Sequence, residues 1–155
     1  AFAYEAALDQ INRQQPRVLL LALGEPDEWA HARRYDRYLD SIRRCDRFIR
    51  QLWEFLQARP DYRDSTTLLI SPDHGRGIEG KDWTSHGRNV PDSEQTWLMA
   101  LGPDTRPLGE RRDTPPVHQA QVAATLAALL GEDFRADFPE AAGPVEDFLP
   151  ISGKD

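Results

Sequence analysis

The stretch TTLLISPDHG, residues 66–75, joins a short apolar run to an abrupt polar turn. Its β-branched and aliphatic residues favour a strand over residues 66–71. Pro72 and Gly75 are typical chain breakers, so the strand is expected to end there. Asp73 and His74 therefore come directly after a predicted strand, which is where ligands bind in α/β sheets.

A second apolar run, VLLLAL at residues 18–23, precedes this stretch along the chain. A continuous run of this length is typical of a strand covered on both faces. Between the two runs, apolar residues recur at steps of three and four from Tyr35 to Leu56, which predicts a long amphipathic helix. Strand, helix and strand form a βαβ unit with a right-handed crossover, so we expect an α/β fold with a mainly parallel sheet flanked by helices.

The rest of the chain adds three predicted elements. Residues 2–14 suit a helix, residues 95–101 alternate like a strand, and residues 117–130 suit a helix that Gly131 ends. No regular structure is predicted from residue 132 onward. We therefore expect one domain over residues 1–131 and an irregular tail over residues 132–155.

Composition narrows the classes of partner. The 155-residue chain has a net charge of −7, which argues against binding bare nucleic acid or an anionic membrane surface. No apolar run approaches the roughly 18 residues of a membrane-spanning helix. The single cysteine, Cys45, lies on the apolar stripe of the long helix and is interpreted as a buried structural thiol.

Candidate metal ligands cluster near the predicted strand ends. Asp27 and His31 follow the first apolar run, and their four-residue spacing places both on one face if a helix begins near residue 26. His86 lies in a long polar loop, residues 75–93, that can fold back over the strand ends. Imidazole and carboxylate ligands without thiolates suit a catalytic site for zinc, with manganese as an alternative. The candidates are Asp27, His31, Asp73, His74 and His86.

Each candidate also has a plain structural interpretation. Asp27 is an acid of the kind that helix N-termini prefer, because it faces the positive end of the helix dipole. His31 alone suits a surface or capping histidine, and residues 73–75 alone suit a polar turn. Their joint placement after predicted strands favours the metal site over these separate roles.

Three cations, Arg76, Lys81 and Arg88, lie in the loops beside the candidate ligands. They are interpreted either as anion-binding groups for a substrate or as solvated charges that balance an acidic chain. The remaining histidine, His118, begins the last predicted helix among polar neighbours. We expect it to be exposed and outside the site.

Three motifs resemble the C-terminal metal-binding motifs of the alkaline phosphatase superfamily: GEPDEWAH at residues 24–31, SPDHG at 71–75 and SHG at 85–87. The resemblance implies a three-layer α/β/α fold with two divalent metal ions. It implies that one ion is bound by Asp27, His31 and His86. The other is implied to bind Asp73 and His74, together with an earlier Asp and a nucleophile that have no counterpart in this chain.

The resemblance implies a metal-dependent hydrolase of phosphate or sulfate esters that works by in-line displacement. Its substrate is expected to be a small anionic ester. The nucleophile is expected upstream of Ala1, in an N-terminal half of the same polypeptide, so this chain is predicted to be inactive alone. Analogy with the superfamily favours a periplasmic or secreted location. The alternatives are an α/β domain that uses divalent metal for a structural or interaction role, and a small domain whose polar residues do not converge.

Overall fold

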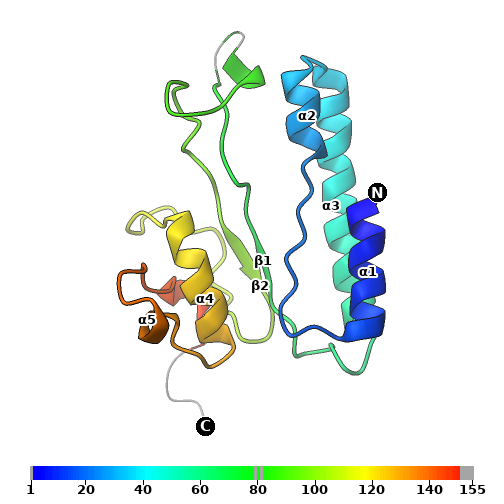
Figure 1. The fold of residues 1–155 in the computed structure, drawn as a ribbon, viewed down its shortest axis with the longest axis vertical. Helices are drawn as coiled ribbons and strands as arrows, with labels where there is room; N and C mark the ends of the chain where they lie inside the picture. The colour runs from blue at the N-terminus through cyan, green and yellow to red at the C-terminus, as the bar shows by residue number, and fades with distance from the viewer. Residues whose placement is uncertain (1, 79, 81, 151–155) are drawn as a thin grey trace. The chain divides into compact units, whose positions relative to one another are not determined.

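The structure is a computed structural model that describes residues 2–78, 80 and 82–150. The chain forms two units (Figure 1). The first consists of the described parts of Ala1–Pro60 and His74–Thr96, and the second of the described parts of Asp61–Asp73 and Trp97–Asp155. The predicted boundary at residue 131 stays a prediction.

Three α-helices and one short 3-10 helix build the described part of the first unit: α1 (Phe2–Gln14), α2 (Glu25–His31), α3 (Tyr35–Gln57) and η1 (Asp82–Thr84). The predicted helices at 2–14 and 35–56 are therefore confirmed. Figure 1 shows α1 and α2 lying along α3. The Tyr4 ring of α1 stacks on Phe48 of α3 with ring centroids 4.4 Å apart. Ile11 is buried on the same face of α1, about two turns further along the helix.

Helix α2 is held against α3 by close packing and by one ion pair. Ala30 is fully buried, so α2 approaches its neighbours with only a methyl group between them. The Glu25 carboxylate accepts hydrogen bonds from Arg44 Nη1 at 2.8 and 3.0 Å. These contacts fix the helix that carries two of the candidate ligands.

The prediction of a strand at residues 18–23 is wrong. This segment has no strand conformation, and Val18 and Leu20 are 52% and 91% exposed. An apolar run becomes a strand only when its backbone pairs with a neighbouring strand. No strand among the described residues pairs with this segment, so the expected parallel pair with residues 66–71 does not form.

The second unit contains a two-stranded sheet of β1 (Leu68–Ile70) and β2 (Met99–Leu101). The strands are antiparallel, with Leu69 opposite Ala100. The strands predicted at 66–71 and 95–101 therefore exist but are shorter than expected. The predicted parallel sheet is not found in the described residues.

Four short helices complete the second unit: η2 (Gln119–Gln121), α4 (Val122–Leu129), α5 (Phe134–Asp137) and η3 (Glu146–Phe148). The first two replace the helix predicted at 117–130. The last two lie where no regular structure was predicted. Asp133 explains α5, because its carboxylate caps the helix by accepting from the Arg135 backbone N–H at 2.9 Å.

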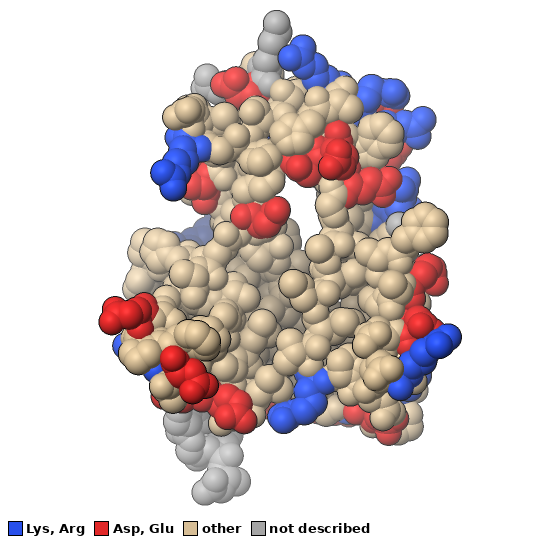
Figure 2. Space-filling view, in the orientation of Figure 1, with Lys and Arg blue, Asp and Glu red and all other residues tan. Residues whose placement is uncertain are grey.

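The distribution of charged side chains and the length and polarity of the helices are relevant to the predictions about nucleic acid and membranes. Acidic and basic side chains are interspersed on the face drawn in Figure 2. Every helix in the described part of the chain is too short or too polar to span a membrane.

Candidate metal centre

Helix α2 presents Asp27 and His31 on one face. Pro26 lies in its first turn, and the Asp27 N–H donates to the Gly24 carbonyl at 3.1 Å, so the acid is held in the first turn of the helix. His31 follows one turn later, and its Nε2 lies 3.4 Å from Asp27 Oδ2. The helix expected near residue 26 is present, and both side chains point the same way.

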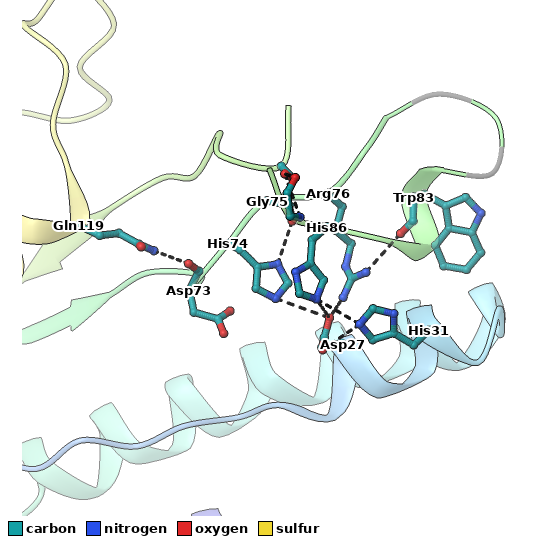
Figure 3. Close-up of polar contacts among 11 residues, drawn as sticks. Asp27, His31, Asp73, His74, Gly75, Arg76, Trp83, His86 and Gln119 are labelled. Carbon is teal, nitrogen blue, oxygen red and sulfur yellow. Dashed lines mark hydrogen bonds and ion pairs between the residues drawn. The ribbon is translucent and has the colours of Figure 1, made fainter. Parts of the chain in front are cut away.

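Two further histidines approach the same carboxylate from outside α2 (Figure 3). The Nε2 atoms of His74 and His86 lie 3.6 and 3.7 Å from Asp27 Oδ1. Their rings stack with centroids 3.7 Å apart and an interplanar angle of 16°. His86 Nε2 also lies 3.1 Å from His31 Nε2. Three imidazole nitrogens therefore gather around one acid.

A backbone contact of His74 defines the hydrogen-bonding role of one of its ring nitrogens. His74 Nδ1 lies 2.8 Å from the Gly75 carbonyl oxygen, which can only accept a hydrogen bond. Nδ1 must therefore donate in this contact, and Nε2 is the nitrogen that faces Asp27. A backbone carbonyl that orients an imidazole in this way is a common outer contact of metal-binding histidines.

The spacing of these atoms fits a metal ion. Bonds of about 2.0–2.2 Å to a tetrahedral ion place neighbouring ligand atoms roughly 3.3–3.6 Å apart. The separations between Asp27 and the three histidines, 3.4, 3.6 and 3.7 Å, fall close to that range. One ligand atom each from Asp27, His74 and His86 lies within 4.8 Å of the other two. The donor set is able to hold a divalent ion.

Ser93 connects the segment that follows His74 to the segment that follows His86. Its side chain is 6% exposed, and its Oγ donates to the Gly87 carbonyl at 2.7 Å and accepts from the Gly87 N–H at 3.2 Å. Its own carbonyl accepts from the Gly75 N–H at 2.7 Å. A single residue thus connects the segments that follow His74 and His86. The sequence carried no signal for it beyond a serine near the end of the long polar loop.

Arg76 is the main residue that the sequence left undecided. Its Nη2 donates to Asp27 Oδ1, and its Nη1 donates to the Trp83 carbonyl at 3.4 Å. The guanidinium also lies over the Tyr38 ring, 5.8 Å from the ring centroid. The side chain is only 13% exposed, and burial lowers the pKa of the guanidinium. Arg76 is therefore part of the site and not a solvated charge.

The remaining predicted site residue, Asp73, belongs to the second unit. There the side-chain amide of Gln119 donates to the carbonyls of Pro72 and Asp73 at 2.7 and 2.8 Å. The role of Asp73 as a metal ligand stays a prediction. His118 is exposed and takes part in the N-terminal cap of η2, in keeping with its exclusion from the site.

The family of the chain follows from a match over residues 3–93 to the model of the metalloenzyme superfamily. The matched segment contains Asp27, His31, His74 and His86, the four residues that the structure brings together. The chain belongs to the metalloenzyme superfamily, and the resemblance to alkaline-phosphatase-like enzymes is confirmed.

Individual relatives are enzymes named for phosphate chemistry. The chain is 30% identical over 152 residues to GPI ethanolamine phosphate transferase 1 of Neurospora crassa, and the match covers 84% of the chain and 15% of that protein. The same-named protein of Chaetomium globosum is 29% identical, with 84% of the chain and 16% of that protein covered. A 2,3-bisphosphoglycerate-independent phosphoglycerate mutase of Gracilaria tenuistipitata var. liui is 27% identical over 90 residues, which are 55% of the chain and 17% of that protein. No solved structure matches the chain.

Proposed function

We propose that the chain is the metal-binding part of a metal-dependent enzyme that acts on phosphate esters. The observation that carries this proposal is the convergence of three imidazole Nε2 atoms on the Asp27 carboxylate, at 3.4, 3.6 and 3.7 Å. Relatives of the chain are a phosphate transferase and a phosphoglycerate mutase, which favours phosphate over sulfate esters. Hydrolysis is the case in which water is the acceptor, and transfer is the case in which another hydroxyl group is.

We further propose two divalent ions, with zinc as the preferred metal. Asp27, His31 and His86 would hold one ion, and Asp73 and His74 would contribute to the other. His74 Nε2 lies about as near to Asp27 as His86 Nε2 does, which supports two neighbouring ligand sets. Bound ions would supply Lewis-acid stabilisation of the charge on the ester oxygens.

The chain's own groups have separate tasks in this proposal. Asp27 supplies the negative charge that attracts a cation, and the Gly75 carbonyl fixes the tautomer of His74 so that its Nε2 stays available. Ser93 keeps the two histidine loops at their spacing. A ligand set held by backbone contacts in this way needs little rearrangement when it binds a cation.

Catalysis is proposed to need parts of the polypeptide outside this chain. The chain spans 15–16% of the length of the phosphate transferases that it matches, and a nucleophile is proposed to lie in the rest. The chain alone should therefore release no phenol from an aryl phosphate in the presence of zinc or manganese. Turnover by the chain alone would contradict this part of the proposal.

Metal binding is tested by titrating zinc or manganese into the chain in a calorimeter. Asp27→Asn and His86→Ala should each weaken binding by at least about 10- to 100-fold, the loss typical when only an outer contact of a ligand is removed. The first substitution removes the negative charge of a ligand, and the second removes a ligand atom. His118→Asn is the matched control, since this exposed histidine lies at a helix cap that asparagine also suits. Binding that is equal in all four proteins would refute the site.

A further inference from the structure

Arg76 donates a hydrogen bond to the Asp27 carboxylate oxygen that faces two of the proposed ligands, His74 and His86. Its Nη2 donates to Asp27 Oδ1, the same atom that lies 3.6 Å from His74 Nε2 and 3.7 Å from His86 Nε2 (Figure 3). A guanidinium has no lone pair and stays cationic in proteins, so it cannot bind a metal ion. Arg76 therefore acts as a counter-ion of Asp27.

A divalent ion and Arg76 compete for this carboxylate oxygen. The ion takes up the negative charge of the carboxylate that Arg76 otherwise neutralises, and the two positive charges repel each other at the edge of a partly buried site. An ion at Asp27 therefore weakens the pairing of Arg76 with Oδ1.

Two other contacts keep Arg76 near the site after it leaves Asp27. Its Nη1 donates to the Trp83 carbonyl at 3.4 Å, and the guanidinium lies over the Tyr38 ring. Trp83 itself packs edge-on against Tyr35 and at a tilt against Tyr38, with centroids 5.2 and 5.8 Å apart. These contacts keep the guanidinium beside the aromatic cluster without help from Asp27.

A guanidinium in this position requires an anion. The Arg76 side chain is 13% exposed, and neither the Trp83 carbonyl nor the Tyr38 ring carries a negative charge. A largely buried charge without a counter-ion is costly. The guanidinium matches the paired oxygens of a phosphoryl group, to which it donates two parallel hydrogen bonds.

We propose that Arg76 exchanges partners: it neutralises Asp27 until a divalent ion takes the charge of that carboxylate, and it then binds an oxygen of the anionic phosphate ester. The inference rests on the proposed function. It assigns Arg76 as a substrate-binding residue that also sets the affinity for metal.

The first test is zinc titration of the wild-type chain and of Arg76→Ala. The exchange requires the variant to bind zinc more tightly, by about tenfold, because one charge-assisted hydrogen bond no longer competes. Arg88→Ala is the control, since it removes the same charge from an exposed position in the same loop, and its zinc affinity should stay within about twofold of wild type. A merely structural arginine would give the opposite sign, because losing it would loosen the ligands.

The second test measures the anion. Phenylphosphonate, a phosphate-ester analogue that cannot be hydrolysed at its P–C bond, is titrated into each zinc-saturated protein. Arg76→Ala should bind it about tenfold more weakly than wild type, and Arg76→Lys should fall between them, because lysine keeps the charge but loses the paired donors. Opposite effects on zinc and on phosphonate are the signature of the exchange.

The outcomes separate this inference from the proposed function. If wild type binds zinc and Arg76→Ala binds it equally or more weakly, the exchange is refuted while the metal site stands. If zinc binding is tighter in the variant but phosphonate binding is unchanged, the ester is not the new partner of Arg76 and the inference also fails. If the wild-type chain binds no divalent ion, both the inference and the proposed function fail.

Discussion

Gly75 lies directly after His74 at a point where two backbone segments nearly touch. A Cβ built at this position meets the Gln95 carbonyl oxygen at 2.3 Å and the Asp92 carbonyl oxygen at 2.8 Å. Both neighbours are backbone atoms, so no side-chain rotation relieves the contact. Gly75→Ala should therefore push the segment of His74 away from the segment of Ser93.

The magnitude follows from these contacts. The shorter one is about 1 Å below ordinary van der Waals separation. Overpacking of this kind costs about 1–3 kcal/mol. Relieving it also lengthens the 2.7 Å hydrogen bond from the Gly75 N–H to the Ser93 carbonyl, whose loss costs about 1 kcal/mol. The free energy of unfolding should therefore fall by about 3 kcal/mol.

Urea denaturation followed by tryptophan fluorescence measures this change. With a denaturant slope of about 2 kcal/mol/M, the midpoint should fall by about 1.5 M. Gly24→Ala is the matched control, because a Cβ at Gly24 meets no atom within 4 Å and its φ of −79° suits alanine. The control should stay within about 0.5 kcal/mol of wild type.

The zinc affinity of the same proteins provides a second readout. Gly75→Ala should weaken binding, since the Gly75 carbonyl orients the His74 ring, while Gly24→Ala should not. Equal urea midpoints for wild type and Gly75→Ala would refute the close approach of the two segments.

Three further predictions test the packing. Leu20→Lys should change the free energy of unfolding by less than about 0.5 kcal/mol, because Leu20 is 91% exposed. Leu56 is only 4% exposed, so Leu56→Ala should lower the free energy of unfolding by about 2–5 kcal/mol in the same urea assay. Burial raises the pKa of the Cys45 thiol, so iodoacetamide should alkylate Cys45 more slowly than it alkylates glutathione at pH 8.5. The rate of alkylation of Cys45 should also reach half its maximum at a higher pH. Mass spectrometry of timed samples measures both rates. Thr125→Ala should lower thermal stability by about 1–3 kcal/mol, because it leaves the buried Val145 N–H without its acceptor at 2.9 Å, while Thr125→Ser should keep most of the stability.

The sequence predicted those features that depend on local spacing. Steps of three and four fixed the long helix now seen as α3, and the four-residue spacing of Asp27 and His31 placed both on one face of α2. These patterns need no knowledge of distant residues, because the helix itself sets the geometry. The same holds for the positions, though not the lengths, of β1 and β2.

The sheet could not be predicted in the same way. A strand is defined by its partner, and the apolar run at residues 18–23 carries no information about whether a partner strand lies beside it. The run forms no strand and is largely exposed, because nothing in the described part of the chain pairs with it. The antiparallel pairing of β1 and β2 likewise depends on the path of the chain between residues 70 and 99, and periodicity does not report this path.

The same difference between local and long-range information applies to single residues of the candidate site. Histidines and acids after predicted strands were identified because their chemistry is specific, but Arg76 was indistinguishable from a solvated cation until its burial and its contact with Asp27 were known. Its charge is visible in the sequence, whereas its partner, brought from 49 positions away, is not. Ser93 was missed for the same reason: its importance lies in two loops that meet at its side chain and carbonyl. Residues that act through such long-range contacts are therefore the ones for which a site predicted from motifs needs the structure.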